Sequence, residues 1–172
     1  RKRFVAFHPM WGTENSGPKA AQKESFAGRA AVICDREDSE QDALALVENI
    51  AKNLEMHLIY MNADAHDVHT AYISHISHIT SYALANTVLE KEREEDTIFQ
   101  LASSGFSSTV RLAKSHPEMW VPIFKQNKEN VLDVLNEHIT QLRKFKSALE
   151  KENFELLEEL IKNANKIRGI LK

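Results

Sequence analysis

HDVHTAYISHISH, residues 66–78, places four of the chain's eight histidines on one predicted helix. At about 3.6 residues per turn, two stripes run along this helix. One stripe is small and polar: Asp67, Ala71, Ser74, His78, Ser81 and Ala85. The other is apolar: Val68, Tyr72, Ile76, Ile79 and Ala83. We expect the apolar stripe to pack against a core, and the polar stripe either to admit a neighbouring backbone or to line a site.

Composition excludes several classes of protein. The chain has 172 residues, 42% of them hydrophobic, which is enough for a buried core. The net charge is -3, and the charged residues are mixed rather than gathered, so a nucleic-acid surface is not expected. Cys34 is the single cysteine, which favours a buried thiol in a reducing compartment. No apolar run approaches the roughly 20 residues of a membrane span, and we expect a soluble, cytoplasmic protein.

The first third of the chain reads as α/β. Strands are predicted at residues 3–7, 30–34 and 56–61, with a loop at 8–18 after the first. A helix with apolar residues at helical spacing follows the second strand, and Ser39 is its predicted N-cap. This order is typical of the end of an open α/β sheet, so we expect further strands outside a chain that starts at Arg1 as if cut from a longer protein.

From Asn62 onward the patterns predict helices only. They are expected at 64–93, at 96–102, from 107 to just before Pro117, and at 117–125. Two longer helices follow, and each has the apolar spacing that requires a helical partner. We expect two subunits to share these faces, and a self-contained bundle is the alternative.

Two histidine-bearing stretches could carry chemistry. His8 leaves the first strand for a glycine-containing loop, where open sheets bind ligands, and its imidazole could take a proton or hold a hydroxyl; a loop histidine bonded to backbone is the alternative. On the histidine helix, His78 is the residue most expected to face a ligand. The rival interpretation is a metal-dependent hydrolase that uses the His66–Asp67 pair with His75 and His78, although it would need ligands from other helices.

A third stretch, residues 103–115, places serines and a threonine around Gly105 at a predicted helix start. Backbone N–H groups there could bind an anion, and Arg111 could hold a carboxylate, although helical arginines are usually salt-bridged surface groups. The five glycines, at 12, 17, 28, 105 and 169, form neither a dinucleotide fingerprint nor a phosphate-binding loop. The cofactor-binding residues therefore stay unknown.

Three motifs in order resemble the prephenate dehydrogenase family, including its arogenate-using relatives. Residues 8–17 are similar to the family's His-Pro-Met-x-Gly-Thr-Glu-x-Ser-Gly loop. Residues 66–78 are similar to its His-Asp-x6-Ser-His-Leu-Pro-His helix. Residues 105–120 are similar to its Gly-Phe-Arg-Asp-x-Thr-Arg-Ile-Ala segment and the Pro-x-x-Trp that follows. Spacing agrees from about residue 3 to residue 130.

The resemblance implies a mainly α fold: the carboxyl-terminal end of a Rossmann-like nucleotide-binding domain at 1–62, followed by an all-helical dimerisation domain at 63–172. It implies oxidative decarboxylation of prephenate to 4-hydroxyphenylpyruvate with NAD or NADP, in a homodimer that tyrosine could inhibit and that uses no metal. His8 would be the catalytic residue and would draw the hydroxyl proton. The implied substrate-binding residues are His78, Arg111, Trp120 (from the partner subunit), Ser74, Thr13 and Glu14.

The departures from the family leave alternatives open. Ser107 and Ser108 replace a charged pair, which leaves the choice between prephenate and arogenate and the response to tyrosine undecided. Ser77 replaces a proline, so the helix is expected to be straighter there. Trp11 fills a variable position and could change the shape of the pocket. This chain alone is expected to be inactive, and the alternative function is a non-catalytic dimerisation or tyrosine-sensing module.

Overall fold

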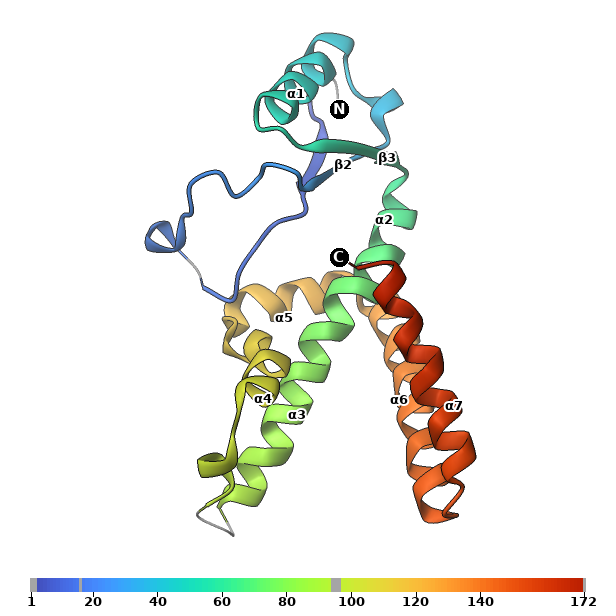
Figure 1. Ribbon diagram of the computed structural model, residues 1–172. Helices are drawn as coiled ribbons and strands as arrows, with labels where there is room; N and C mark the ends of the chain where they lie inside the picture. Colours follow the sequence, from blue (N-terminus) through green and yellow to red (C-terminus); the bar gives the residue numbers. More distant parts are fainter. Residues whose placement is uncertain (1–2, 16, 94–96, 172) are drawn as a thin grey trace. The chain divides into compact units, whose positions relative to one another are not determined.

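The computed structural model describes residues 3–15, 17–93 and 97–171 (Figure 1). Ser16 of the loop motif and Asp96, the predicted start of a short helix, lie outside these residues. The chain divides into two compact units, Arg1–Val131 and Leu132–Lys172. The sheet, the histidine helix and the loop motif all belong to the first unit.

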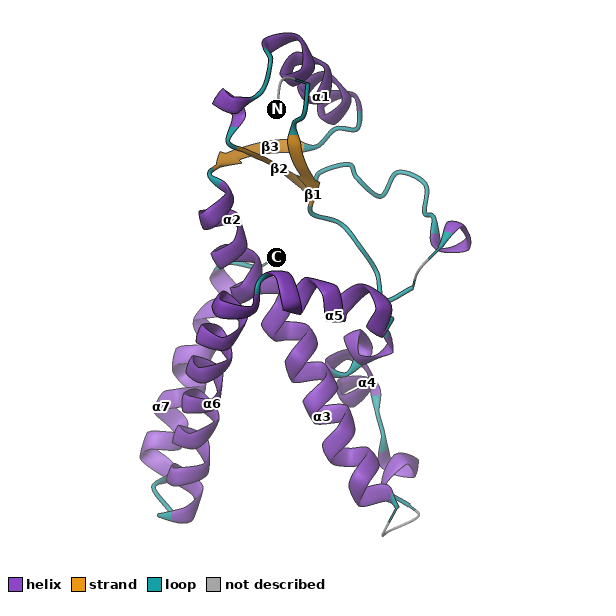
Figure 2. Cartoon of the chain, turned by 180° about the vertical axis from the view of Figure 1, so that it is seen from behind, coloured by secondary structure: helices purple, strands orange, loops and turns teal. Residues whose placement is uncertain are grey.

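A three-stranded sheet opens the first unit (Figure 2). It comprises β1 (Ala6–Pro9), β2 (Ala30–Cys34) and β3 (His57–Met61), with β1 antiparallel and β3 parallel to the central β2. The predicted strands at 30–34 and 56–61 are confirmed, and the first strand begins three residues later than expected. Apolar side chains fill β2, and all but its first residue are buried, including Cys34, as expected for a structural thiol. Burial raises the pKa of that thiol, which stays protonated.

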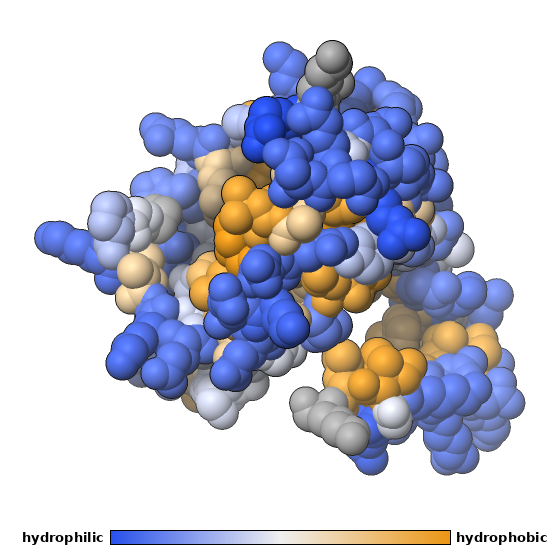
Figure 3. Space-filling view, turned by 90° about the horizontal axis from the view of Figure 1, so that it is seen from above, coloured by the Kyte–Doolittle hydropathy of each residue, from blue (hydrophilic) through white to orange (hydrophobic). Residues whose placement is uncertain are grey.

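The helix α1 (Gln41–Asn53) joins β2 to β3 and packs Ala51 against Ala31 and Met56. Ser39 is not its N-cap: the Ser39 hydroxyl donates to the carbonyl of Phe4 at 3.0 Å, and Glu40 precedes the first helical residue without a side-chain cap. The hydroxyl is buried, so it satisfies the backbone of the entering chain instead of the helix start. Seen from above, apolar side chains lie exposed among hydrophilic ones (Figure 3). The exposed large apolar residues of α1 and β3 are Leu46, Ile50, Ile59 and Tyr60.

The histidine helix has an interruption that the sequence did not predict. It consists of α2 (Ala63–Thr70), a π-helical turn (Ala71–His75) and α3 (Ile76–Glu92). Asn62 caps the start by accepting from the backbone N–H of Ala65 at 2.7 Å. A π-turn adds a residue to one turn and so rotates everything after it about the helix axis, and such turns are frequent at functional sites.

The expected burial of the two stripes is wrong for the apolar one. Val68 and Tyr72 are 38% and 45% exposed, whereas Ala71, His78 and Ser81 of the polar stripe are no more than 8% exposed. The polar stripe is the buried one, because the segments packed against it approach closely and offer polar partners. The Ser81 hydroxyl donates to the carbonyl of Thr109 at 2.6 Å, which confirms that small residues admit a neighbouring backbone.

Short helical segments pack against α3. They are a 3-10 turn (Ile98–Leu101), α4 (Ser104–Thr109), a second 3-10 turn (Arg111–Lys114) and α5 (Pro117–Gln126). The helix expected from residue 107 to Pro117 is therefore wrong, because the chain breaks at Val110 and continues as a tighter turn. Pro117 begins α5 as predicted, since a proline at the first position loses no helical hydrogen bond.

The second unit holds most of α6 (Lys128–Glu150) and all of α7 (Phe154–Ala164). The turn between them places Glu152 at a φ of 52°, and Asn153 caps α7 by accepting from the N–H of Leu156 at 3.0 Å. The exposed large apolar residues of this unit are Leu132, Leu142, Leu149, Phe154, Leu156, Ile161, Ile167, Ile170 and Leu171. In the described part of the chain, no helix combines the length and the apolar character of a membrane span.

Candidate active site

A cavity of about 940 Å³ lies within the first unit, between β1, the loop after it, the histidine helix and α5. Its size is within the range of small-molecule sites. Most of its wall is apolar, and a few polar side chains face it, as expected for a site that orients a ligand. The sequence-predicted residues that line it are His8, Thr13, Ser74, His78 and Trp120.

His8 sits in β1 opposite Val32 of β2, which fixes its backbone in the sheet. Its Nδ1 lies 2.8 Å from Nε2 of His66, and the two rings meet edge to face. Burial lowers the pKa of His8, and a proton on His66 would lower that pKa further. The ring is therefore neutral at pH 7 and can accept a proton.

His78 is a second histidine that lines the cavity, from the histidine helix. Its Nδ1–H donates to the carbonyl of Ser74 at 3.0 Å, because a carbonyl can only accept. The imidazole stacks on Trp120, with ring centroids 3.4 Å apart and 27° between the planes. Burial lowers the pKa of His78 against the opposing effect of the Ser74 bond, and Arg111 lowers that pKa further. His78 is thus a neutral imidazole whose Nε2 is free to accept.

Trp120 contacts His78 of its own chain. The resemblance implied that this tryptophan comes from the partner subunit, whereas here α5 supplies it in the same unit as the histidine helix. Its indole N–H is buried and meets no hydrogen-bond acceptor among the residues that the structure describes.

Arg111 and Glu14 are not among the residues that line the cavity. They pair with each other instead, with Nη1 of Arg111 2.7 Å from Oε2 of Glu14. A backbone hydrogen bond at Glu14 and the bond from Arg111 lower the pKa of the Glu14 carboxyl. The effect of Arg111 on His78 shows that the guanidinium acts on the cavity electrostatically although it does not line it.

The hydroxyls in the stretch whose backbone N–H groups were expected to bind an anion form hydrogen bonds within the helix. The hydroxyls of Ser108 and Thr109 both donate to the carbonyl of Gly105 inside α4. Neither Ser107 nor Ser108 lines the cavity. The part of the chain that the structure describes contains no group of three or more His, Cys, Asp and Glu side chains placed to hold a metal ion.

The sequence predicted no catalytic or substrate-binding role for four residues that the structure places at the cavity: His66, Asp67, His75 and Asn127. The buried His75 ring meets Trp120 and Phe124 edge to face, and the Asn127 amide lies 3.3 Å from its Nδ1. The adjacent His66–Asp67 pair was the available signal, and it was weighed as a metal-ligand pair. Nothing local marks Asn127, which the fold brings in from 52 residues beyond His75.

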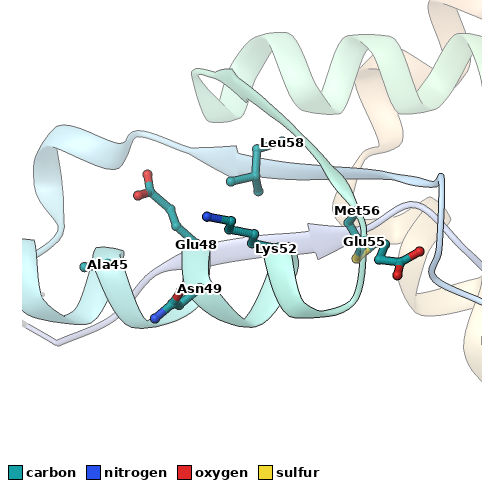
Figure 4. A pocket seen from close by; sticks show the side chains of 7 residues that line it. All are labelled: Ala45, Glu48, Asn49, Lys52, Glu55, Met56 and Leu58. Carbon is teal, nitrogen blue, oxygen red and sulfur yellow. The ribbon is translucent and has the colours of Figure 1, made fainter.

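A second hollow of about 680 Å³ lies on α1 and β3 (Figure 4). Its wall mixes apolar side chains with Glu48, Lys52 and Glu55. The Glu48 carboxylate already accepts from the hydroxyl of Tyr60 at 2.8 Å. This hollow contains no histidine or other predicted site residue, so the larger cavity is the candidate active site.

Two family models together match nearly the whole chain. "Prephenate dehydrogenase, nucleotide-binding domain" matches residues 1–60, and "Prephenate dehydrogenase, dimerization domain" matches residues 62–163. The chain is 30% identical to prephenate dehydrogenase of Bacillus subtilis over 168 residues, covering 98% of this chain and 45% of that protein. It is also 30% identical to cyclohexadienyl dehydrogenase of Zymomonas mobilis, covering 98% of this chain and 58% of that one. The chain thus spans about half the length of these relatives.

Solved structures show the same fold. The prephenate dehydrogenase of Aquifex aeolicus in complex with hydroxyphenyl propionate and NAD+ superposes with a TM-score of 0.88 at 29% identity, covering 99% of this chain and 59% of that one. The arogenate dehydrogenase of Synechocystis gives a TM-score of 0.77 at 23% identity, covering 99% of this chain and 62% of that one. At that lower identity the likeness concerns the fold alone.

Proposed function

The chain belongs to the prephenate dehydrogenase family, and we propose that the full-length protein oxidatively decarboxylates prephenate to 4-hydroxyphenylpyruvate on the route to tyrosine. One observation carries the proposal: His8, a neutral imidazole bonded through one nitrogen to His66, lines the same cavity as His78 and Trp120. Arogenate is the alternative substrate, because the family includes arogenate-using relatives and the chain is also similar to a cyclohexadienyl dehydrogenase.

His8 is the proposed proton acceptor. The substrate carries a hydroxyl on the ring carbon that is oxidised, and His8 takes the proton of that hydroxyl as the carbon loses its hydride. Loss of carbon dioxide leaves the bond electrons in the ring, which becomes aromatic as a phenolate. His8 returns the same proton to the phenolate oxygen, so the imidazole is neutral again after each turnover.

Arg111 is the proposed partner of a substrate carboxylate. A guanidinium has five N–H donors, and Glu14 engages only Nη1. The substrate carboxylate can take the other donors or displace Glu14, and Glu14 then acts as a gate beside Thr13. His78, stacked on Trp120, offers the acceptor nitrogen Nε2 on the opposite wall.

The residues present fit one end of a nicotinamide dinucleotide. Phe4 and Met10 line the cavity with His8 and offer apolar surface to a flat ring, while the five glycines of this chain form no pyrophosphate-binding loop. When bound, the nicotinamide would supply the hydride acceptor. NAD is the first candidate and NADP the second, since the Aquifex aeolicus structure contains NAD+.

We also propose a homodimer and a domain boundary near residue 62. The helical part matches a dimerization domain, and α6 and α7 leave apolar side chains exposed that a second copy would cover. Asn62 caps α2 directly after β3, so the nucleotide-binding part ends at 62 and the helical domain covers 63–172.

Initial rates with the full-length protein test the function. Prephenate and arogenate are each combined with NAD and NADP, and reduced cofactor is followed by absorbance, with tyrosine added as a competitor. The proposal expects turnover of prephenate. An absence of turnover with every pair, together with saturable tyrosine binding, would replace the enzyme by the sensing module.

A further inference from the structure

We propose that His66 and Asp67 are positioning residues that hold His8 in one tautomer, with hydrogen on Nδ1 and the lone pair of Nε2 left for the substrate hydroxyl. This inference rests on the proposed function, because it gives a direction to the proton transfer at His8. It also gives a role to the His-Asp pair, which needs no metal ion for it.

The hydrogen bonds form a chain of two links. Oδ1 of Asp67 lies 2.9 Å from Nδ1 of His66, and Nε2 of His66 lies 2.8 Å from Nδ1 of His8. An ionised carboxylate only accepts, so the first link requires hydrogen on Nδ1 of His66. In the neutral ring Nε2 of His66 is then an acceptor, so the second link requires hydrogen on Nδ1 of His8. The remaining nitrogen of His8 carries the lone pair.

The backbone around the pair is held from two elements. The Asn127 amide, at the end of α5, donates to the carbonyl of Asp67 at 2.7 Å, and the Thr70 hydroxyl donates to the carbonyl of His66 at 3.0 Å. The His66 side chain is 18% exposed, whereas the Asp67 side chain is 54% exposed. These contacts hold the backbone of the pair in place, and the exposure of the Asp67 carboxylate allows its replacement without a packing defect.

The same chain stabilises His8 after it accepts a proton. The imidazolium keeps its Nδ1–H bond to His66, and the carboxylate of Asp67 lies at the far end of the relay with the opposite charge. No proton needs to leave the site, since the phenolate takes it back. The arrangement therefore favours both the accepting and the returning step, as an aspartate does for a histidine in a hydrolase triad.

Asp67→Asn in the full-length protein tests the proposal. The amide can donate to Nδ1 of His66, which places hydrogen on Nε2 of His66 and on Nε2 of His8, the unproductive tautomer. We expect kcat to fall about 10-fold, less than in a buried triad because water reaches this carboxylate, with KM changed by less than about twofold. Asp67→Glu should recover most of the rate. Asp64→Asn removes an exposed carboxylate from the same helix and should leave kcat unchanged.

Nitrogen NMR of histidine-labelled protein reads the tautomer directly. The His8 signals are assigned with His8→Asn and recorded above the pKa of the ring, where protonated and unprotonated nitrogens differ widely in chemical shift. We expect hydrogen on Nδ1 in the wild type and on Nε2 in Asp67→Asn. Hydrogen on Nε2 in the wild type, or an Asp67→Asn enzyme with unchanged kcat, would overturn the inference. Unchanged activity of His8→Asn would instead overturn the proposed function itself.

Discussion

The cavity of the first unit and the helical pair of the second differ in how they treat polar and apolar groups. The cavity region buries His75, His78 and Ser81 to 8% exposure or less, and each finds a hydrogen-bond partner within the unit. The helical pair leaves Leu142 and Phe154 56% and 59% exposed. These buried polar groups are satisfied by residues of the first unit, whereas the open apolar faces fit the proposal that a second copy covers them.

Replacing His8 should produce the largest effect on the cavity side of this comparison. His8→Asn keeps a polar side chain in β1 but removes the group that takes the hydroxyl proton. We expect kcat with prephenate to fall by about 10²-fold or more, which is the usual contribution of a general base. Steady-state rates of the full-length protein measure it, with His69→Asn, an exposed histidine of α2, as the control. A variant with wild-type kcat would remove His8 from the mechanism.

A charge on the exposed apolar face of α6 should weaken the proposed dimer. Leu142→Glu places a carboxylate in the middle of the exposed apolar surface of α6, and desolvating it in an interface is costly. We expect the dimer dissociation constant to rise at least about 10-fold, as measured by sedimentation equilibrium. Gln141→Glu adds the same charge one residue earlier without removing an apolar side chain and should have a smaller effect. Equal dissociation constants for the wild type and Leu142→Glu would show that this face lies outside the interface.

Substitutions in the Arg111–Glu14 pair test whether Arg111 binds the substrate and Glu14 competes for it. Arg111→Met removes the proposed carboxylate partner and should weaken prephenate binding about 10-fold, because a charge-assisted bond contributes about 1.5–3 kcal/mol and this guanidinium is partly exposed. Glu14→Gln removes the competitor and should leave binding equal or tighter. Calorimetry on both variants, with the exposed Lys125→Met as the control, gives the comparison. Weaker binding in both variants would contradict a gating role for Glu14.

The smallest expected effect is a loss of folding stability at acidic pH. Burial lowers the pKa of His75 and of His78 below the ordinary 6.5, so the unfolded chain binds more protons than the folded one as pH falls below 6.5. The free energy of unfolding should therefore decrease on acidification from pH 7, until the folded-state pKa values are passed. Thermal unfolding by circular dichroism at pH 7 and pH 5.5 measures it. His78→Phe, which keeps a ring against Trp120, should flatten this dependence, and an unchanged pH dependence in that variant would contradict the assignment.

Local patterns predicted much of the fold. The apolar run of β2 was predicted as a strand, Pro117 was predicted to begin a helix, and the motif residues His8, Ser74, His78 and Trp120 do line one cavity. The predictions failed where a contact with a distant part of the chain replaced the local one. Ser39 caps no helix because a buried carbonyl of Phe4 takes its hydroxyl. The apolar stripe is exposed because the polar stripe has closer partners, and the π-turn at Ala71–His75 has no sequence signal that periodicity can detect.

The sequence predicted several residues of the site but not the contacts between them. Arg111 was expected in the pocket, yet a carboxylate 97 residues away holds it outside the cavity wall. The role of His66 depends on β1 lying beside α2, which no spacing within either segment reveals.

Calorimetric titration of prephenate into the full-length protein without cofactor tests the central claim, that this cavity binds the substrate. Ser74 lines the cavity from the π-turn, and Ser74→Phe would fill the space beside His78 and Trp120. Ser104→Phe, at an exposed position of α4, is the matched control. The account predicts saturable binding to the wild type and to Ser104→Phe, and no detectable binding to a folded Ser74→Phe variant. Wild-type affinity in Ser74→Phe would place the substrate elsewhere and contradict the account.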